Sequence, residues 1–259
     1  MAILSILNNV NQIGITDQNK NLQFGGDWTE AKLKVLEGYL QAYTTALKDK
    51  PTAGKPFKKG YIDAFAGTGY REERFVNSET SDVSQTLLFP EIAESEAQKL
   101  LDGSARIALK TKPRFDKYIF IESSATRCNQ LEELKREFPD LADDISVRHG
   151  NANNEIQDIC NRNWKSHRAV LLLDPFGMQV EWKTIEAIAQ TKAIDLWMLF
   201  PLGMAVNRLL KRSGEISESW RLRLDSIFGT NDWYDKFYKV ETQRTLFGEK
   251  KVVAPSVSI

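Results

Sequence analysis

The sequence predicts an α/β protein built on a mostly parallel sheet with helices on both faces. Five short apolar runs alternate with segments whose apolar residues recur at helical intervals, and hydrophobic residues make up 42% of the chain, enough for a sizeable core. Strands separated by helices are typical of βαβ units, whose helices cover both faces of the sheet. A chain of 259 residues suits one large domain or one domain with additions.

The first predicted helix begins at Asp27. Glu30 follows at the spacing of a capping box, and the helix ends near Lys50 and Pro51. Its apolar residues recur at helical intervals: Leu33, Leu36, Leu40, Tyr43 and Leu47. We expect residues 1–26 to form an N-terminal arm and residues 27–259 to form the single domain.

The five apolar runs predict strands at residues 60–65, 118–122, 145–149, 169–174 and 194–200. Helical patterns lie between the second and third strands (124–138), between the third and fourth (153–164), and between the fourth and fifth, where Trp182, Ile185 and Ile188 share one side.

The interval between the first two strands is too long for a single helix. Residues 72–102 hold eight acidic residues against two basic ones, so an acidic insertion or lid is expected at 70–103. Ser104 can cap a displaced crossover helix over residues 105–110. Residues 203–259 predict a C-terminal helical extension, which ends without a terminating element, as an incomplete last segment would.

Composition narrows the classes of function. The 35 basic residues balance the 35 acidic ones, so contact with a nucleic acid would need a local patch. Two cysteines and two histidines are too few for a usual zinc site or a disulfide framework. No apolar run approaches the ~20 residues that cross a bilayer, and the chain start lacks a basic leader. The sequence therefore predicts a cytoplasmic, metal-free protein.

An aspartate and two glycines follow the first predicted strand, in residues 63–69 (DAFAGTG). Gly67 and Gly69 permit a sharp turn and a close backbone approach to a ligand, and the carboxylate of Asp63 suits a ligand with an ammonium group. A dinucleotide fingerprint would need a third glycine where Glu72 stands, which argues against a dehydrogenase. An ordinary glycine turn is the alternative.

Polar residues also end the second and third predicted strands. The carboxylate of Glu122 can accept hydrogen bonds from a ribose diol, and an adenine ring could find partners at Asn151 and Ala152. The alternatives are a solvated acid that caps the next helix and, for Asn151, a turn residue or helix N-cap.

The fourth predicted strand ends in Asp174, Pro175 and Phe176. Because proline cannot continue the ladder, the chain turns there. The Asp174 carboxylate and the Pro175 carbonyl can accept from a planar amine while the Phe176 ring stacks on the base. A structural turn is the alternative.

A basic cluster follows the fifth predicted strand. Residues 205–223 carry a local excess of three positive charges, and a phosphate-binding role competes there with that of a solvated face. The candidate phosphate contacts are Arg208, Lys211, Arg212 and Arg221.

In this order, the strand-end motifs look like those of class I S-adenosylmethionine-dependent methyltransferases. Five stretches resemble, more closely, the three-Cys-motif partner protein family (TcmP): 28–32 (WTEAK) with Tyr39 and Leu40, 61–69 (YIDAFAGTG), 101–109 (LDGSARIAL), 120–122 (FIE) and 173–177 (LDPFG). The resemblance runs from about residue 24 to 238. It departs from the family at Asn151, where an aspartate is usual, and in its single proline at 175, where amino-methyltransferases carry two.

The resemblance implies a Rossmann-like class I methyltransferase fold with S-adenosylmethionine as cofactor. It also implies a radical-SAM-like partner protein with three cysteines, in bacteria or phages. The implied cofactor-binding residues are Asp63, Phe65, Gly67, Gly69, Glu122, Asn151 and Ala152, and the implied catalytic residues are Asp174, Pro175 and Phe176. The expected function is methyl transfer to an amino group of a nucleic acid. The alternative is a catalytically idle partner subunit that binds the three-Cys protein or an RNA.

Overall fold

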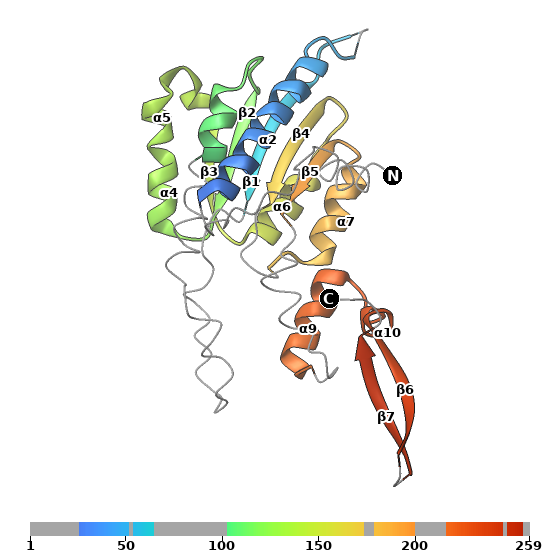
Figure 1. Cartoon of the computed structure of the whole chain (residues 1–259). Coiled ribbons are helices and arrows are strands. Elements are labelled where there is room, and N and C mark those ends of the chain that lie inside the picture. Colours follow the sequence, from blue (N-terminus) through green and yellow to red (C-terminus); the bar gives the residue numbers. More distant parts are fainter. Residues whose placement is uncertain are drawn as a thin grey trace, which may run out of the picture.

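A computed structural model describes residues 26–51, 54–64, 103–173, 179–199, 216–245 and 248–255. Five strands form one parallel sheet: β1 (Lys58–Ala64), β2 (Lys117–Glu122), β3 (Ile145–His149), β4 (His167–Leu173) and β5 (Ile194–Met198). Their order in the sheet is β3-β2-β1-β4-β5 (Figure 1). This order is that of a Rossmann-like fold, and it confirms the predicted class of a mostly parallel sheet with helices on both faces.

One face of the sheet is covered by the first helix and by the helices between β1 and β3. These are α2 (Gly26–Ala46), the helical residues 103–110, α4 (Ala125–Glu132) and the short α5 (Leu134–Glu137) (Figure 1). Their buried apolar side chains meet an aromatic cluster from the sheet and its loops: Tyr61, Phe115, Tyr118 and Phe120. This face holds the larger share of the described core.

The other face is covered by α6 (Ala152–Cys160) and α7 (Trp182–Thr191). The buried side chains of Ile156 and Ile188 on these helices pack against Ile62, Ile121 and Leu171 of the sheet. β1 is therefore buried on both faces, as its position at the centre of a parallel sheet requires.

The predicted helix over residues 124–138 is divided in the structure. α4 and α5 are separated at Glu133, and the backbone of Phe138 leaves the helical region because Pro139 follows it. A 3₁₀ segment, η2 (Pro139–Asp144), then leads into β3. The limits of β3 are the ones predicted from the sequence.

After β5 the described chain resumes with α9 (Glu218–Phe228) and α10 (Trp233–Phe237), and then forms a hairpin of β6 (Tyr238–Thr245) and β7 (Gly248–Pro255). The sequence predicted a helical extension over residues 203–259, but residues 238–255 contain the strands of a hairpin and not helices. Leu224, Trp233 and Tyr238 form a small separate core.

Several predicted segments lie outside the described residues. These are residues 1–25 of the predicted arm, residues 70–102 of the predicted acidic insertion, and residues 203–215 at the start of the predicted extension. Among the helices that are described, none has the length and hydropathy to cross a membrane.

Candidate functional site

The ladders of the sheet bring the predicted motifs to one edge. Ala64, the last residue of β1, pairs with Ile121 on one side and with Leu173, the last residue of β4, on the other. Glu122 pairs with His149, the last residue of β3. The residues that follow these strands therefore start from the same carboxyl edge, where open α/β sheets bind their ligands.

Asp63 lies in β1 one residue before that edge, and its side chain is only 2% exposed. Its Oδ2 accepts a hydrogen bond of 2.6 Å from the hydroxyl of Ser104 and one of 3.1 Å from the hydroxyl of Tyr61. Burial, and then the charge of Asp63, raise the pKa of Tyr61 well above its ordinary value, so Tyr61 stays a donor. Ser104, which was predicted to cap its helix, lies within the helical residues 103–110, and its hydroxyl joins that helix to the first strand.

Glu122, the last residue of β2, is buried and 1% exposed. Its Oε1 accepts a hydrogen bond of 2.7 Å from the backbone N–H of Ser124, at the start of α4, and one of 3.3 Å from the Ser123 hydroxyl. Its Oε2 is buried and has no hydrogen-bond partner in the part of the chain that the structure describes. The predicted alternative, a cap for the next helix, accounts for only one of the two oxygens.

Both carboxylates leave the sheet on the same face. Asp63 pairs with Phe120, whose ring lies in the core beneath α2, and Glu122 is two residues further along that strand. Because side chains alternate along a strand, Asp63 and Glu122 point to that same side. Two buried carboxylates therefore lie at neighbouring strand ends, and the Oε2 of Glu122 has no partner among the described residues.

Asn151 and Ala152 follow β3, as predicted. Asn151 is the N-cap of α6 and its Oδ1 accepts from the backbone N–H of Asn154 at 3.3 Å, which is the predicted alternative role. Its side chain is exposed, whereas Ala152 is buried against the second core.

Sequence reasoning missed Asn153, which is buried in the first turn of α6. Its Nδ2 donates to the carbonyl of Gln179 at 2.8 Å, and its Oδ1 accepts from the backbone N–H of Glu181 at 3.1 Å and from the Thr184 hydroxyl at 2.8 Å. Asn153 therefore links α6, which follows β3, to residues 179–184, which follow the 174–178 segment. Polar residues are common in the first turn of a helix, so the sequence contained no sign that Asn153 would bind residues 179–184.

The remaining predicted residues divide into two groups. Arg221 lies on α9 with its guanidinium carbon 4.4 Å from the centre of the Tyr234 ring. The others lie outside the described residues: Phe65, Gly67, Gly69, Asp174, Pro175, Phe176, Arg208, Lys211 and Arg212. The segments that hold Phe65 and Asp174 directly follow β1 and β4.

Neither cysteine has the character of a catalytic nucleophile. Burial, and then nearby carboxylates, raise the pKa of the Cys128 thiol, and burial raises the pKa of Cys160 to about 11. Both thiols are therefore less ionised than a free cysteine at neutral pH. Thiols of this kind act as small hydrophobic residues.

No protein-family model matches the chain, and no curated protein matches it. Among solved structures, the chain is similar to the O-methyltransferase from Bacillus cereus in complex with SAH, with 11% sequence identity, coverage of 90% of this chain and 91% of that chain, and a TM-score of 0.35. The strand order of the sheet assigns the Rossmann-like fold. The resemblance to TcmP stays a prediction from the motifs.

Proposed function

We propose that the protein is an S-adenosylmethionine-dependent methyltransferase whose cofactor lies at the carboxyl ends of β1, β2 and β3. The observation that carries the proposal is the buried Oε2 of Glu122, which has no partner among the described residues. A buried carboxylate oxygen without a partner costs free energy, and a ribose diol would supply the missing donors. The strand order and the position of Glu122 at the end of β2 support this role.

The other cofactor contacts follow from the chain order. Gly67 and Gly69 would let the backbone approach the methionine part, and Phe65 would lie beside it. Asp63 would hold the ammonium group indirectly, because its Oδ2 already accepts hydrogen bonds from Ser104 and Tyr61. Ala152 and the exposed Asn151 would border the adenine. S-adenosylmethionine, when bound, supplies an activated methyl group.

The target we propose is an amino group of a nucleic acid. The Asp174 carboxylate and the Pro175 carbonyl would accept from the amine and orient its lone pair, while Phe176 stacks on the base. Asp174 would hold the proton that the amine gives up. Because no covalent intermediate is needed, positioning supplies most of the catalysis. Arg208, Lys211, Arg212 and the exposed Arg221 would contact phosphates.

Calorimetric titration of the full chain with S-adenosylmethionine tests the cofactor. We expect saturable binding to one site, and S-adenosylhomocysteine should compete for it. A chain that is folded by circular dichroism and binds neither compound would overturn the proposal. That result would favour the idle partner subunit that binds a three-Cys radical-SAM-like protein or an RNA.

Methyl transfer from labelled cofactor to pooled DNA, tRNA and protein tests the substrate class. Label in a nucleic acid, lost on Asp174→Asn while cofactor affinity holds, is the expected result. We expect the loss to be about 10²-fold or more, because the carboxylate acts chiefly as charge develops on the nitrogen. Label in protein alone would contradict the proposed target and leave the cofactor unaffected.

A further inference from the structure

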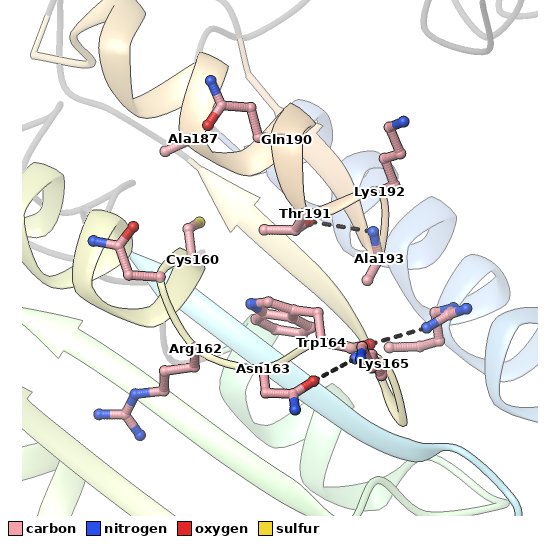
Figure 2. Close-up of a pocket in the computed structure, with 12 residues that line it drawn as sticks. Cys160, Arg162, Asn163, Trp164, Lys165, Ala187, Gln190, Thr191, Lys192 and Ala193 are labelled. Carbon is pink, nitrogen blue, oxygen red and sulfur yellow. Dashed lines mark hydrogen bonds between the residues drawn. The ribbon is translucent and has the colours of Figure 1, made fainter.

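A cavity of about 530 Å³ lies at the opposite edge of the sheet from the proposed active site. Its lining comes from the end of α6 and the loop into β4, residues 160–165 with Arg168, and from the end of α7 and the loop into β5, Ala187 and residues 190–193 (Figure 2). These segments precede β4 and β5, whereas the proposed active site follows strand ends. The cavity is therefore a separate site.

The lining is cationic. Arg162, Lys165, Arg168 and Lys192 contribute to it, and none of the described residues that line it is acidic. Arg162, Lys165 and Lys192 are exposed and form no ion pair with any residue in the described ranges. In a chain of zero net charge, such a concentration of unpaired cations attracts an anion to this place.

Trp164 gives the cavity an aromatic wall. Its indole N–H donates to the carbonyl of Ile159 at 3.1 Å, which fixes the plane of the ring. Figure 2 shows the ring in the middle of the lining residues, with the side chains of Cys160 and Thr191 above it in this view. A fixed tryptophan ring near cations is the combination that binds a nucleotide, because the base stacks while the phosphate is neutralised.

Polar side chains complete the lining. Asn161, Asn163 and Gln190 bring amide groups that can donate to and accept from a base edge. Asn163 uses its Oδ1 for the backbone N–H of Lys165. The lining offers cations and amides, and its one thiol, Cys160, has a raised pKa of about 11. These groups suit binding rather than catalysis.

Lys192 occupies a position that favours glycine. It is the C-cap of α7 in the left-handed region, with φ of 51° and ψ of 22°. Helices usually end in this conformation with glycine, because a Cβ is strained there. The chain thus holds a lysine beside the cavity at a position where glycine would be the more stable residue.

We propose that this cavity binds a phosphate-bearing nucleotide, with the base against Trp164 and the phosphate near Arg162, Lys165 and Lys192. The volume is in the range of small-ligand sites. The nucleotide can be a free mononucleotide or one unit of a single-stranded nucleic acid, since both present the same base and phosphate. The proposal does not depend on the proposed methyltransferase function.

The test uses thymidine monophosphate and a fluorescein-labelled thymidine oligonucleotide with the full chain. Thymine probes avoid the proposed cofactor site, which would favour adenine. Fluorescence anisotropy gives the affinity for the labelled oligonucleotide, and competition against it gives the affinity for thymidine monophosphate. Similar affinities for the two probes would identify the free nucleotide as the ligand. We expect the triple variant Arg162→Ala, Lys165→Ala, Lys192→Gly to bind at least about tenfold more weakly. Its slope of log affinity against log salt for the oligonucleotide should fall by about 0.7, the value for one phosphate contact on a single strand.

Lys192→Gly alone separates binding from structure. It should weaken binding while its melting temperature stays equal or rises, because glycine relieves the left-handed strain. The matched control replaces Lys34, Lys236 and Lys239, exposed on α2, α10 and β6, by alanine and removes the same charge. The proposal is overturned if wild-type protein binds neither probe, if the triple variant binds both as wild type does, or if the control loses as much affinity.

Discussion

The hydroxyl of Ser104 donates a hydrogen bond of 2.6 Å to the carboxylate of Asp63, although 41 positions separate the two residues in the chain. Both side chains are buried. The bond joins the start of the helix over residues 103–110 to the central strand, and it fixes the carboxylate one residue before the proposed cofactor site. Residues 65–102, which follow β1, lie outside the described ranges.

Ser104→Ala should therefore lower the free energy of unfolding by about 1–3 kcal/mol, because a buried carboxylate loses a donor. Urea unfolding followed by circular dichroism measures the change. Ser226→Ala, at an exposed position of α9, is the control and should change the free energy by less than about 0.5 kcal/mol. Equal effects of the two variants would show that the bond to Asp63 does not stabilise the fold.

Glu122→Gln tests the cofactor site more cleanly than alanine. Alanine also deletes the acceptor for the Ser124 backbone N–H, whereas glutamine can keep that bond and removes the charge. We expect S-adenosylmethionine affinity to fall at least about tenfold, since hydrogen bonds to a charged group contribute about 1.5–3 kcal/mol. The melting temperature without ligand should change little.

The control for that measurement is Glu37→Gln, at an exposed position of α2, whose affinity should match the wild type. Calorimetry of both variants decides between the two roles of Glu122. An affinity unchanged by Glu122→Gln would leave Glu122 as a helix cap only.

The parallel sheet could be predicted because β1, β2 and β4 carry apolar residues on both faces. The runs at 118–122 and 145–149 agree with β2 and β3 to within one residue. β1 and β4 begin about two residues earlier than predicted, because the ladder also includes Lys58 and Lys59, which pair with His167 and Arg168. Backbone pairing between polar residues leaves no hydropathy pattern.

The candidate site was predicted where a residue type alone indicates chemistry, as for Asp63 and Glu122. It was missed where the role depends on a distant partner. Asn153 shows this, because its three partners are 26 to 31 positions away. The Oε2 of Glu122 has no partner within the described ranges, and this too depends on the packing and cannot be read from the sequence.

Asn153→Ala should lower the free energy of unfolding by about 2–3 kcal/mol, since three hydrogen bonds are lost and buried groups are left without partners. Asn154→Ala changes the exposed neighbour on the same helix and should have little effect. Denaturant midpoints of the two variants give the comparison. Similar midpoints would contradict a role for Asn153 in holding the segment at residues 179–184.

Asp116 gives a pH-dependent contribution to stability. Burial acts to raise its pKa, but the backbone N–H of Lys59 at 2.8 Å, the Lys58 ammonium at 3.1 Å and the charges of both lysines outweigh burial, so the pKa lies below its ordinary value of 3.8. A depressed carboxyl pKa stabilises the fold above the unfolded pKa, and this stability is lost as the pH falls through the folded pKa.

Asp116→Asn should consequently unfold more easily than wild type at neutral pH, and the difference should narrow below about pH 3.8. Urea unfolding of both proteins across this range measures the difference, and titrations shared by the two proteins cancel. Asp140→Asn, at an exposed position, is the control. A difference that stays constant down to the lowest pH would exclude a contribution from the Asp116 charge.

Gly229 joins the C-terminal helices to the sheet domain through a close contact. It ends α9 with φ of 67°, and a Cβ at this position would lie 2.2 Å from Cδ1 of Trp182 in α7. Gly229→Ala should lower the free energy of unfolding by more than about 1–2 kcal/mol, the cost of the left-handed backbone alone. Gly38→Ala, in α2 with no atom near the new Cβ, should instead raise it by about 0.5–1 kcal/mol.

Gly229→Asn separates backbone strain from the contact with Trp182. Asparagine tolerates the left-handed conformation but brings the same Cβ, so it should recover only part of the loss if the tryptophan ring cannot move. Trp182 is 41% exposed, so its ring has room to move. Its indole N–H donates to Glu186 at 2.9 Å, and a movement of the ring would break that bond. Full recovery with asparagine, measured by thermal unfolding, would show that the ring yields and that conformation alone requires glycine.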